Sequence, residues 1–257
     1  MRVATFNLLH GMSLAHGQVR SGELADAVAA TKADVIGLQE TDRDQPRSGS
    51  VDQTADAAAA LGAEHWRFVP ALCGTPGTSE PWTAVRQGED PDGPAYGVGL
   101  VSRYPVRRWL VRRFPAAPVT LPLLVPGGRG IIRVRDEPRV ALGAVIDAPC
   151  GPLTVLTAHL SFVPGWNLAQ LVSLANWARS LPGPKLLVGD FNLPGALPRL
   201  ASRWHQLTRL PTYPSYGPRL QFDHILADGI PPGAVTHAEA MRLPVSDHCA
   251  LVADLDL

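Results

Sequence analysis

Eight polar residues of types that handle phosphate esters stand at or just beyond the ends of short apolar runs. Asn7 follows the run that begins at Val3, and Glu40 follows the run Asp34–Gln39. The other six positions are His159, Asp190, Asn192, Asp223, Asp247 and His248. Because ligands of α/β proteins gather at the ends of strands, we expect these side chains to converge on one site.

The residue types suit the hydrolysis of a phosphate ester. That reaction needs a cation to neutralise charge, a base to activate water, and an acid or dipoles at the leaving oxygen. Glu40 and Asp247 offer the hard oxygen ligands that Mg²⁺ prefers. The set is rich in carboxylates and lacks a thiolate cluster, which favours Mg²⁺ or Mn²⁺ over zinc. A pair such as Asp223 with His248 would hold one imidazole tautomer and stabilise its protonated form.

Each of these residues also has an ordinary structural explanation. A single Asp after a strand is more often a turn or a helix cap, and Asn7 alone is compatible with an Asx turn. Glu40 alone is compatible with a solvated surface charge, and His159 alone is compatible with a core histidine. A purely structural explanation would need five or six such coincidences in the right order.

Composition bounds the class of protein. The chain has 257 residues, 46% of them hydrophobic, and a formal net charge of zero, so no global charge attracts nucleic acid or an anionic membrane. Cys73, Cys150 and Cys249 show no CxxC spacing, which argues against a disulfide framework and a zinc cluster. No signal peptide or apolar run of membrane-spanning length is evident. We therefore expect a cytoplasmic monomer without a transmembrane segment.

Short runs rich in β-branched and aromatic residues predict buried strands. They are Val3–Leu8, Asp34–Gln39, Val98–Val101, Val140–Ile146, Leu153–Ala158, Lys185–Gly189, Phe222–Ala227 and Ala250–Leu255.

Three helices are predicted between these runs, each with a recognisable boundary signal. They are Glu23–Thr31 with Ser21 as its N-cap, a helix from a Ser50/Gln53 capping box to Leu61 with Gly62 as its stop, and Trp166–Ser180 ahead of Gly183-Pro184.

The order of these elements predicts two packed sheets flanked by helices. No linker divides the chain, so we expect one domain over residues 1–257 with two long loops, 75–94 and 115–130. The second loop is apolar, which suits either a lid over the substrate or a membrane-touching loop, or equally a buried crossover.

The segments around the polar residues resemble, in their order along the chain, the motif set of the endonuclease/exonuclease/phosphatase superfamily. They are Thr5-Phe6-Asn7-Leu8, Leu38-Gln39-Glu40, Thr157-Ala158-His159-Leu160-Ser161, Gly189-Asp190-Phe191-Asn192, Phe222-Asp223-His224-Ile225-Leu226 and Ser246-Asp247-His248. The resemblance implies an α/β fold, a four-layer αββα sandwich of two packed mixed β-sheets flanked by helices.

The resemblance also implies roles for the metal-side residues. Glu40 would bind the divalent cation, helped by Asn7 and Asp247. Asp190 would orient and deprotonate the attacking water, and Asn192 would hold the water or a phosphate oxygen. Abasic endonucleases carry an acidic ligand soon after the first Asn. This chain has none there, which suggests a single metal anchored by Glu40.

The two histidines receive different roles from the resemblance. His248, oriented by Asp223, would stabilise the pentacovalent state, and His159 would donate to a phosphate oxygen from the opposite side. Many relatives carry Asn where this chain has Val98, so the usual partner of His159 is missing.

Four further residues are candidate substrate contacts. Arg43 and Arg47 lie in a loop of the kind found in bacterial members of the superfamily, and Arg matches phosphate geometry well. A charged turn that pairs with its own aspartates is the alternative explanation. Tyr96 is another candidate, and Trp166 would either shape the pocket wall or cap its helix into the core.

The sequence thus predicts a divalent-metal-dependent phosphoesterase that hydrolyses a phosphodiester or phosphomonoester of a small molecule or lipid head group. The alternative is a nuclease acting on DNA or RNA, which would need a basic stripe, and Arg103–Arg113 is the best segment for it. A solvated edge strand would explain the same arginines. A catalytically silent binding protein is disfavoured, because the metal Glu, the water-activating Asp and the final His are all present.

Overall fold

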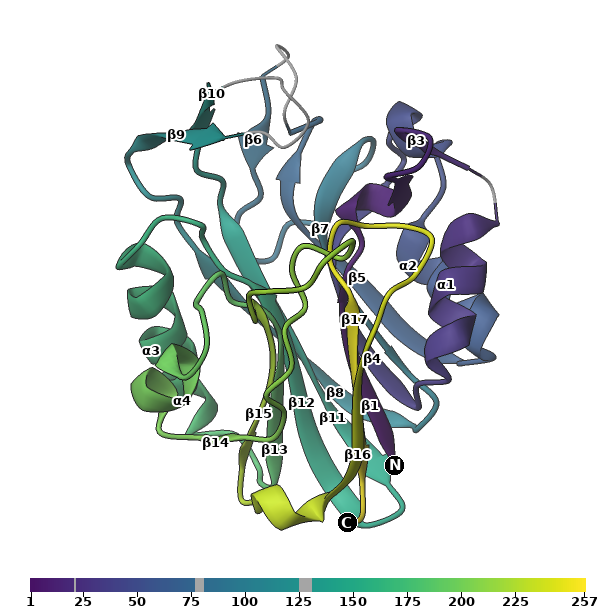
Figure 1. Cartoon of the computed structure of the whole chain (residues 1–257), viewed down its shortest axis with the longest axis vertical. Coiled ribbons are helices and arrows are strands. Elements are labelled where there is room, and N and C mark those ends of the chain that lie inside the picture. Colours follow the sequence, from purple (N-terminus) through teal and green to yellow (C-terminus); the bar gives the residue numbers. More distant parts are fainter. Residues whose placement is uncertain (21, 77–80, 125–130) are drawn as a thin grey trace.

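The computed structural model describes residues 1–20, 22–76, 81–124 and 131–257, and its architecture is a sandwich of two β-sheets (Figure 1). The expected N-cap Ser21 lies outside the described residues, and the N-cap position before Glu23 is occupied by Gly22. Figure 1 shows helices α1 (Glu23–Thr31) and α2 (Gln53–Leu61) on one side of the sandwich, and α3 (Trp166–Ala178) and α4 (Leu197–Ser202) on the other. The expected α/β sandwich is therefore confirmed.

The first sheet has seven strands, and only the β1–β4 pair in it is parallel. Its order is β16 (Val235–Met241), β17 (Ala250–Leu255), β1 (Arg2–Asn7), β4 (Val35–Arg43), β7 (Ala95–Ser102), β5 (His65–Cys73) and β6 (Thr83–Ala84).

The second sheet has six strands, and only the β12–β13 pair in it is parallel. Its order is β14 (His205–Gln206), β15 (Asp223–Asp228), β13 (Lys185–Asp190), β12 (Gly151–His159), β11 (Arg139–Ala148) and β8 (Val106–Phe114). Two small hairpins add β2 (Met12–Ser13) with β3 (Gln18–Val19), and β9 (Thr120–Leu124) with β10 (Ile131–Arg135).

Three apolar cores separate the layers, because successive side chains of a strand point to opposite faces of its sheet. Val3 of β1 packs into the core between the sheets, together with Leu142 of the second sheet. Phe6 of the same strand packs instead under α1 and α2, and Leu156 packs under α3. The strands are thus buried on both faces, which explains their continuous apolar runs.

The three predicted helices are α1 (Glu23–Thr31), α2 (Gln53–Leu61) and α3 (Trp166–Ala178), and they begin and end close to the predicted positions. The helix α4 (Leu197–Ser202) was not predicted. The predicted capping box is wrong, because the N-cap of α2 is Asp52, whose Oδ1 accepts the N–H groups of Thr54 and Ala55 at 2.9 and 3.1 Å. Gly62 does end α2, in the left-handed conformation. Among the described residues, no helix is long and apolar enough to cross a membrane.

Both predicted loops contain strands. The segment 75–94 contributes β6, which pairs with β5, and the segment 115–130 contributes β9, which pairs with β10. The prediction of structureless loops is therefore wrong in those places. Residues 125–130 and the side chains of Leu123 and Leu124 lie outside the described part of the chain, so the lid, membrane-loop and crossover hypotheses stay predictions.

Candidate active site

In the second sheet, strand direction brings three of the predicted residues to one edge. His159 and Asp190 are the last residues of the parallel strands β12 and β13, and they are direct partners in the register. Strand β15 runs antiparallel to β13, so its first residue, Asp223, pairs with Asp190. Chain topology alone thus places these three side chains together.

In the first sheet, β17 runs antiparallel to β1, so the turn before β17 lies beside the end of β1. Asp247 and His248 stand in this turn, next to Asn7 at the end of β1. Ser246 fixes the turn: its Oγ donates to the Asn7 carbonyl oxygen at 2.6 Å and accepts the His248 N–H at 3.0 Å.

Glu40 lies in β4 at an irregularity of the strand. The register between β4 and β7 shifts between Leu38 and Thr41, and Glu40 has a φ of 52°. A left-handed backbone costs energy for a residue other than glycine, and such strain is concentrated at functional sites. A bulge also redirects a side chain, which here brings the Glu40 carboxylate to Asn7.

The buried amide of Asn7 joins the two sheets at the site. Its Nδ2 donates to Glu40 Oε1 and to Asp190 Oδ2, both at 3.0 Å. Asn7 has no solvent-exposed surface, and its Oδ1 accepts the Leu9 N–H at 3.1 Å. Glu40, the predicted metal ligand, and Asp190, the predicted water-activating residue, are therefore held by one amide group.

Asp190 is held from its own strand as well. Its Oδ1 accepts the N–H of Asn192 at 2.9 Å, which closes the turn after β13. The residue before it, Gly189, has a φ of 152°, and a Cβ there would lie 2.0 Å from the Ala158 carbonyl oxygen. Only glycine fits this approach of the two strands.

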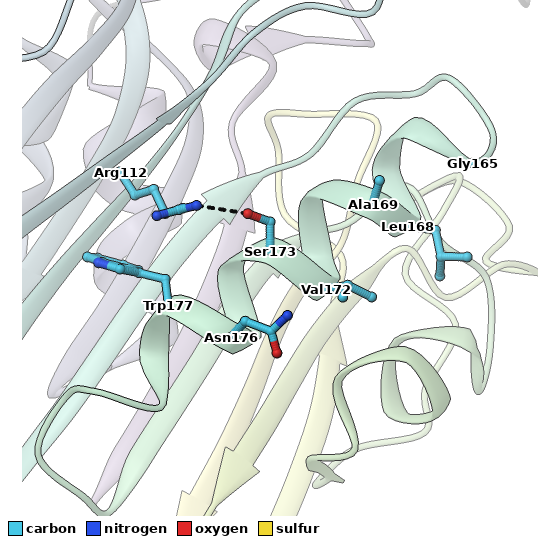
Figure 2. A pocket seen from close by; sticks show the side chains of 8 residues that line it. All are labelled: Arg112, Gly165, Leu168, Ala169, Val172, Ser173, Asn176 and Trp177. Carbon is cyan, nitrogen blue, oxygen red and sulfur yellow. Dashed lines mark hydrogen bonds between the residues drawn. The ribbon is translucent and has the colours of Figure 1, made fainter.

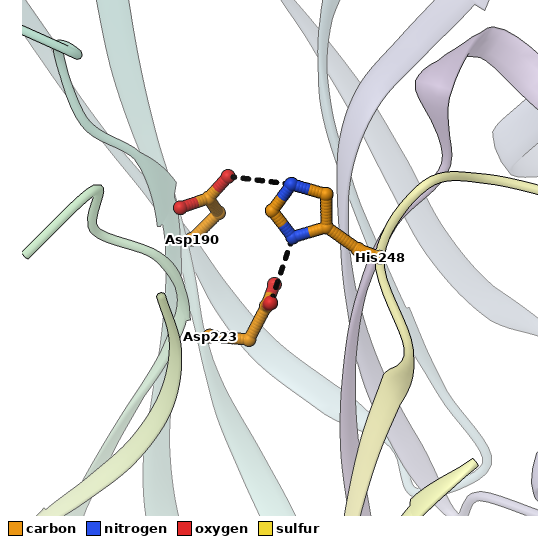
Figure 3. A group of neighbouring side chains, drawn as sticks. All are labelled: Asp190, Asp223 and His248. Carbon is orange, nitrogen blue, oxygen red and sulfur yellow. Dashed lines mark hydrogen bonds and ion pairs between the residues drawn. The ribbon is translucent and has the colours of Figure 1, made fainter. Parts of the chain in front are cut away.

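His248 and Asp223 form the predicted pair (Figure 3). His248 Nδ1 lies 2.8 Å from Asp223 Oδ2, and its Nε2 lies 3.7 Å from Asp190 Oδ2. Burial lowers the pKa of His248, but the charges of Asp223 and Asp190 outweigh burial and raise the pKa to about 10. The ring of Tyr213, a residue not predicted, lies against the imidazole with 4.8 Å between ring centroids. His248 is thus a cation at neutral pH.

His159 faces Asp190 from the other side and has a different environment. Its Nε2 lies 3.6 Å from Asp190 Oδ2 and 3.3 Å from Asn192 Nδ2. Its Nδ1 lies 3.2 Å from Nη1 of Arg139, the first residue of β11. Arg139 is absent from the residues predicted from sequence, and its one signal is the charged run Asp136-Glu137-Pro138-Arg139 ahead of an apolar strand.

The acidic residues fit a divalent cation. Burial, and then the charge of Asp247, raises the pKa of Glu40 to about 7, and burial raises the pKa of Asp247. Two neighbouring carboxylates suit a hard cation that binds oxygen. Asp190, Asp223 and His248 are also close enough to share an ion, with ligand atoms within 4.8 Å of one another. The imidazole Nδ1 of that group already binds a carboxylate, so Glu40 and Asp247 fit better.

The predicted substrate-binding residues are held mostly by the protein itself. Arg47 places Nε and Nη2 on the two carboxylate oxygens of Asp42, at 2.8 and 2.7 Å, with its Cζ 5.7 Å from the centre of the Tyr96 ring. Tyr96 is buried. Arg43 Nη2 lies 2.9 Å from Asp90 Oδ1 and 2.7 Å from a backbone carbonyl. The alternative of a charged turn that pairs with its own aspartates accounts for the Arg47–Asp42 contact, whereas Arg43 pairs with an aspartate of another segment, Asp90.

Trp166 begins α3, and its indole Nε1 donates to the Pro115 carbonyl oxygen at 3.2 Å. A cavity of about 680 Å³ lies along the exposed side of the same helix (Figure 2). Its lining consists of Arg112, Gly165, Leu168, Ala169, Val172, Ser173, Asn176 and Trp177. None of the predicted site residues lines this cavity, so its size alone does not make it the active site.

The sequence profile of the Endonuclease/Exonuclease/phosphatase family matches residues 4–248, and the chain belongs to this family. Members of the family are hydrolases of phosphoesters and generally depend on a divalent metal. The chain is 27% identical to the uncharacterized protein YbhP of Escherichia coli (strain K12), over 100% of this chain and 96% of that protein.

Solved structures show the same fold. An endonuclease/exonuclease/phosphatase from Beutenbergia cavernae matches with a TM-score of 0.67 at 23% identity, over 100% of this chain and 71% of that one. Sphingomyelinase C from Streptomyces griseocarneus matches with 0.61 at 16% identity, over 100% and 99% of the two chains. A mannosyl-6-phosphatase from Bacteroides thetaiotaomicron matches with 0.59 at 15% identity, over 100% of both.

Proposed function

We propose that this protein is a Mg²⁺- or Mn²⁺-dependent phosphoesterase acting on a small molecule or a lipid head group. The observation that carries the proposal is the Asn7 amide, which holds Glu40 and Asp190 at 3.0 Å each. This contact sets a carboxylate suited to a cation beside a carboxylate suited to activating water. The Asp223–His248 pair completes the set, with His248 Nε2 3.7 Å from the Asp190 oxygen that also accepts from Asn7.

Different residues carry out the separate parts of phosphoester hydrolysis. A divalent cation, held by Glu40 with Asp247 and Asn7, would supply charge neutralisation at the phosphate. Asp190 accepts the proton of the attacking water, and burial raises its pKa towards neutrality, as a base at neutral pH requires. His248 stabilises the pentacovalent state through an Nε2–H hydrogen bond to a phosphoryl oxygen, and gives this proton to the leaving oxygen as the ester P–O bond breaks.

The arrangement of the arginines favours a substrate other than nucleic acid. Strand β8 is the outer strand of its sheet, as the edge-strand alternative requires. Arg107 pairs with Asp147 at 2.6 Å, and Arg112 donates to Ser173 at 2.9 Å. Arg113 donates to the carbonyl oxygen of Pro70. These three side chains bind different parts of the protein and do not form the single basic stripe that a nuclease needs.

The structural neighbours do not identify the substrate of this protein. One is a sphingomyelinase and another a mannosyl-6-phosphatase, and both share only the fold with this chain at 15–16% identity. The substrate therefore has to be determined by assay.

Parallel assays separate the two substrate classes. The wild type is incubated with bis-p-nitrophenyl phosphate, p-nitrophenyl phosphate and plasmid DNA, each with Mg²⁺ and with Mn²⁺. We expect turnover of a small ester and intact plasmid. Plasmid nicking that is lost in the Asp190→Asn variant would overturn the proposal in favour of a nuclease. The ratio of the two small-ester rates distinguishes a diesterase from a monoesterase.

The Glu40→Gln variant tests the metal assignment without an activity assay. The pKa of Glu40 is raised in the folded state, so its carboxylate form destabilises the metal-free protein increasingly as pH rises from 4.5 to about 7. At pH 8 in EDTA, we expect Glu40→Gln to increase the free energy of unfolding by up to about 3 kcal/mol. Mg²⁺ should then stabilise the wild type, by about 2.7 kcal/mol at 100 times Kd, and stabilise the variant much less.

The matched control is Glu64→Gln, which neutralises an exposed glutamate at the other end of the first sheet. It should leave the response to Mg²⁺ unchanged. Thermal unfolding with increasing Mg²⁺ measures both effects. An equal response of wild type and Glu40→Gln to Mg²⁺ would show that Glu40 is not a metal ligand.

A further inference from the structure

The contact between Arg139 and His159 determines where the imidazole carries its proton. Arg139 Nη1 lies 3.2 Å from His159 Nδ1. A guanidinium group has donors only and stays protonated at accessible pH, so His159 Nδ1 must be the acceptor of this hydrogen bond. The proton of the neutral ring then resides on Nε2, the atom that faces Asp190 at 3.6 Å.

Arg139 is itself fixed in place. Its side chain is 5% exposed, and its Nη2 lies 3.4 Å from Asp136 Oδ1. Asp136 has no exposed surface, and its other oxygen accepts the N–H of Ala117 at 2.6 Å and the hydroxyl of Ser161 at 2.9 Å. This network holds the guanidinium rigidly, so the orientation of the His159 ring follows from it.

The same contact keeps His159 neutral. Burial, followed by the positive charge of Arg139, lowers the pKa of His159 well below its ordinary value. The other imidazole of the site, His248, pairs with Asp223 and is cationic. When the environments of two similar groups move their pKa values apart in this way, the two groups usually have different roles.

The groups facing His159 Nε2 suggest its task. Asn192 Nδ2 lies 3.3 Å away and already donates one hydrogen to the Leu160 carbonyl oxygen at 3.0 Å. With a proton on Nε2, two donors stand side by side, and no hydrogen bond forms between them. A phosphate oxygen placed between them would accept from both.

We infer that Arg139 is a positioning residue that locks His159 as a neutral Nε2–H donor, which together with the Asn192 amide receives a non-bridging phosphate oxygen. The inference rests on the proposed function for the identity of the oxygen, whereas the tautomer follows from the Arg139 contact alone. In this arrangement His159 does not transfer a proton, and the proton transfers are carried out by Asp190 and His248.

Nitrogen NMR of the wild type tests the inference directly. Long-range ¹⁵N–¹H spectra of the histidine rings distinguish the two tautomers and the protonated form, and His159→Gln identifies the His159 signals. We expect Nε2 protonated and Nδ1 bare from pH 8 down to pH 5.5. A proton on Nδ1, or a doubly protonated ring above pH 5.5, would overturn the inference. This result does not depend on whether the enzyme hydrolyses any ester tested.

The variants Arg139→Met and Arg139→Lys add a functional readout. With Met, His159 loses its donor and the neighbouring charge while burial still lowers its pKa, so the pKa of His159 should rise but stay below the ordinary value. We expect kcat/KM to fall about 10–100-fold, as for other residues that orient an active-site histidine. Arg139→Lys, which keeps a charged donor, should recover part of the rate.

The control is Arg112→Met, which removes an arginine of the neighbouring strand whose partners are Ser173 and aromatic rings. It should alter neither the His159 signals nor kcat/KM. A normal rate and an unchanged His159 titration in folded Arg139→Met would contradict the inference. Should Arg139→Met fail to fold because Asp136 loses its partner, the wild-type spectrum still decides the question.

Discussion

Replacing Asp190 by Asn is expected to reduce phosphoester hydrolysis by about 10²–10⁴-fold, the usual contribution of a positioned general base. The amide is isosteric with the carboxylate, and its oxygen can still accept the Asn192 N–H that now lies 2.9 Å from Asp190 Oδ1. The amide cannot accept a proton from water. The loss should therefore appear in kcat, with little change in KM.

The fold of Asp190→Asn should survive, because the substitution removes the negative charge of a buried carboxyl group. Burial raises the pKa of this group. Circular dichroism and urea unfolding measure this point. Asp228→Asn is the matched control, since Asp228 lies at the far end of the strand that pairs with β13 and contacts Lys185 at 2.9 Å. A folded Asp190→Asn variant with wild-type turnover would show that this carboxylate does not activate water.

Replacing His248 by Ala should also cost about 10²–10⁴ in rate, because the site would lose its cationic donor. Asp223→Asn should produce a smaller loss, since the 2.8 Å contact with Asp223 raises the pKa of His248 and fixes its ring. Asp223 acts through His248, so the double variant should be no slower than His248→Ala alone.

A double-mutant cycle on kcat/KM measures this coupling. Losses that multiply in the double variant would mean that Asp223 acts independently of the imidazole. Asp223 is fully buried, so the unfolding free energy of each variant is measured alongside, and only folded variants enter the cycle.

The sequence predicted much of the site because strand ends are visible in a single chain. Asp190 and Asp223 close and open neighbouring strands, and a carboxylate at the boundary of an apolar run is enough to find each of them. The parallel and antiparallel registers then bring the ends together. The layered fold follows similarly from runs that are apolar on both faces.

Contacts that depend on how the two sheets pack could not be predicted. The Asn7 amide reaches Asp190 across the sandwich, over a sequence separation of 183 residues. Arg139 reaches His159 from the neighbouring strand, and no motif marks it. The N-cap of α2 was misplaced for a local reason, because Ser50, Asp52 and Gln53 all carry side chains that can cap a helix. The prediction of one domain over the chain stays a prediction.

Metal-dependent ester hydrolysis at this site can be tested with a single titration. Wild-type protein is freed of metal with EDTA, dialysed, and assayed on bis-p-nitrophenyl phosphate and p-nitrophenyl phosphate while Mg²⁺ or Mn²⁺ is added back. We expect no turnover without metal and saturable turnover when metal is added. This turnover should be abolished in the Asp190→Asn variant. Equal turnover with and without EDTA, or metal-dependent turnover retained in Asp190→Asn, would contradict it.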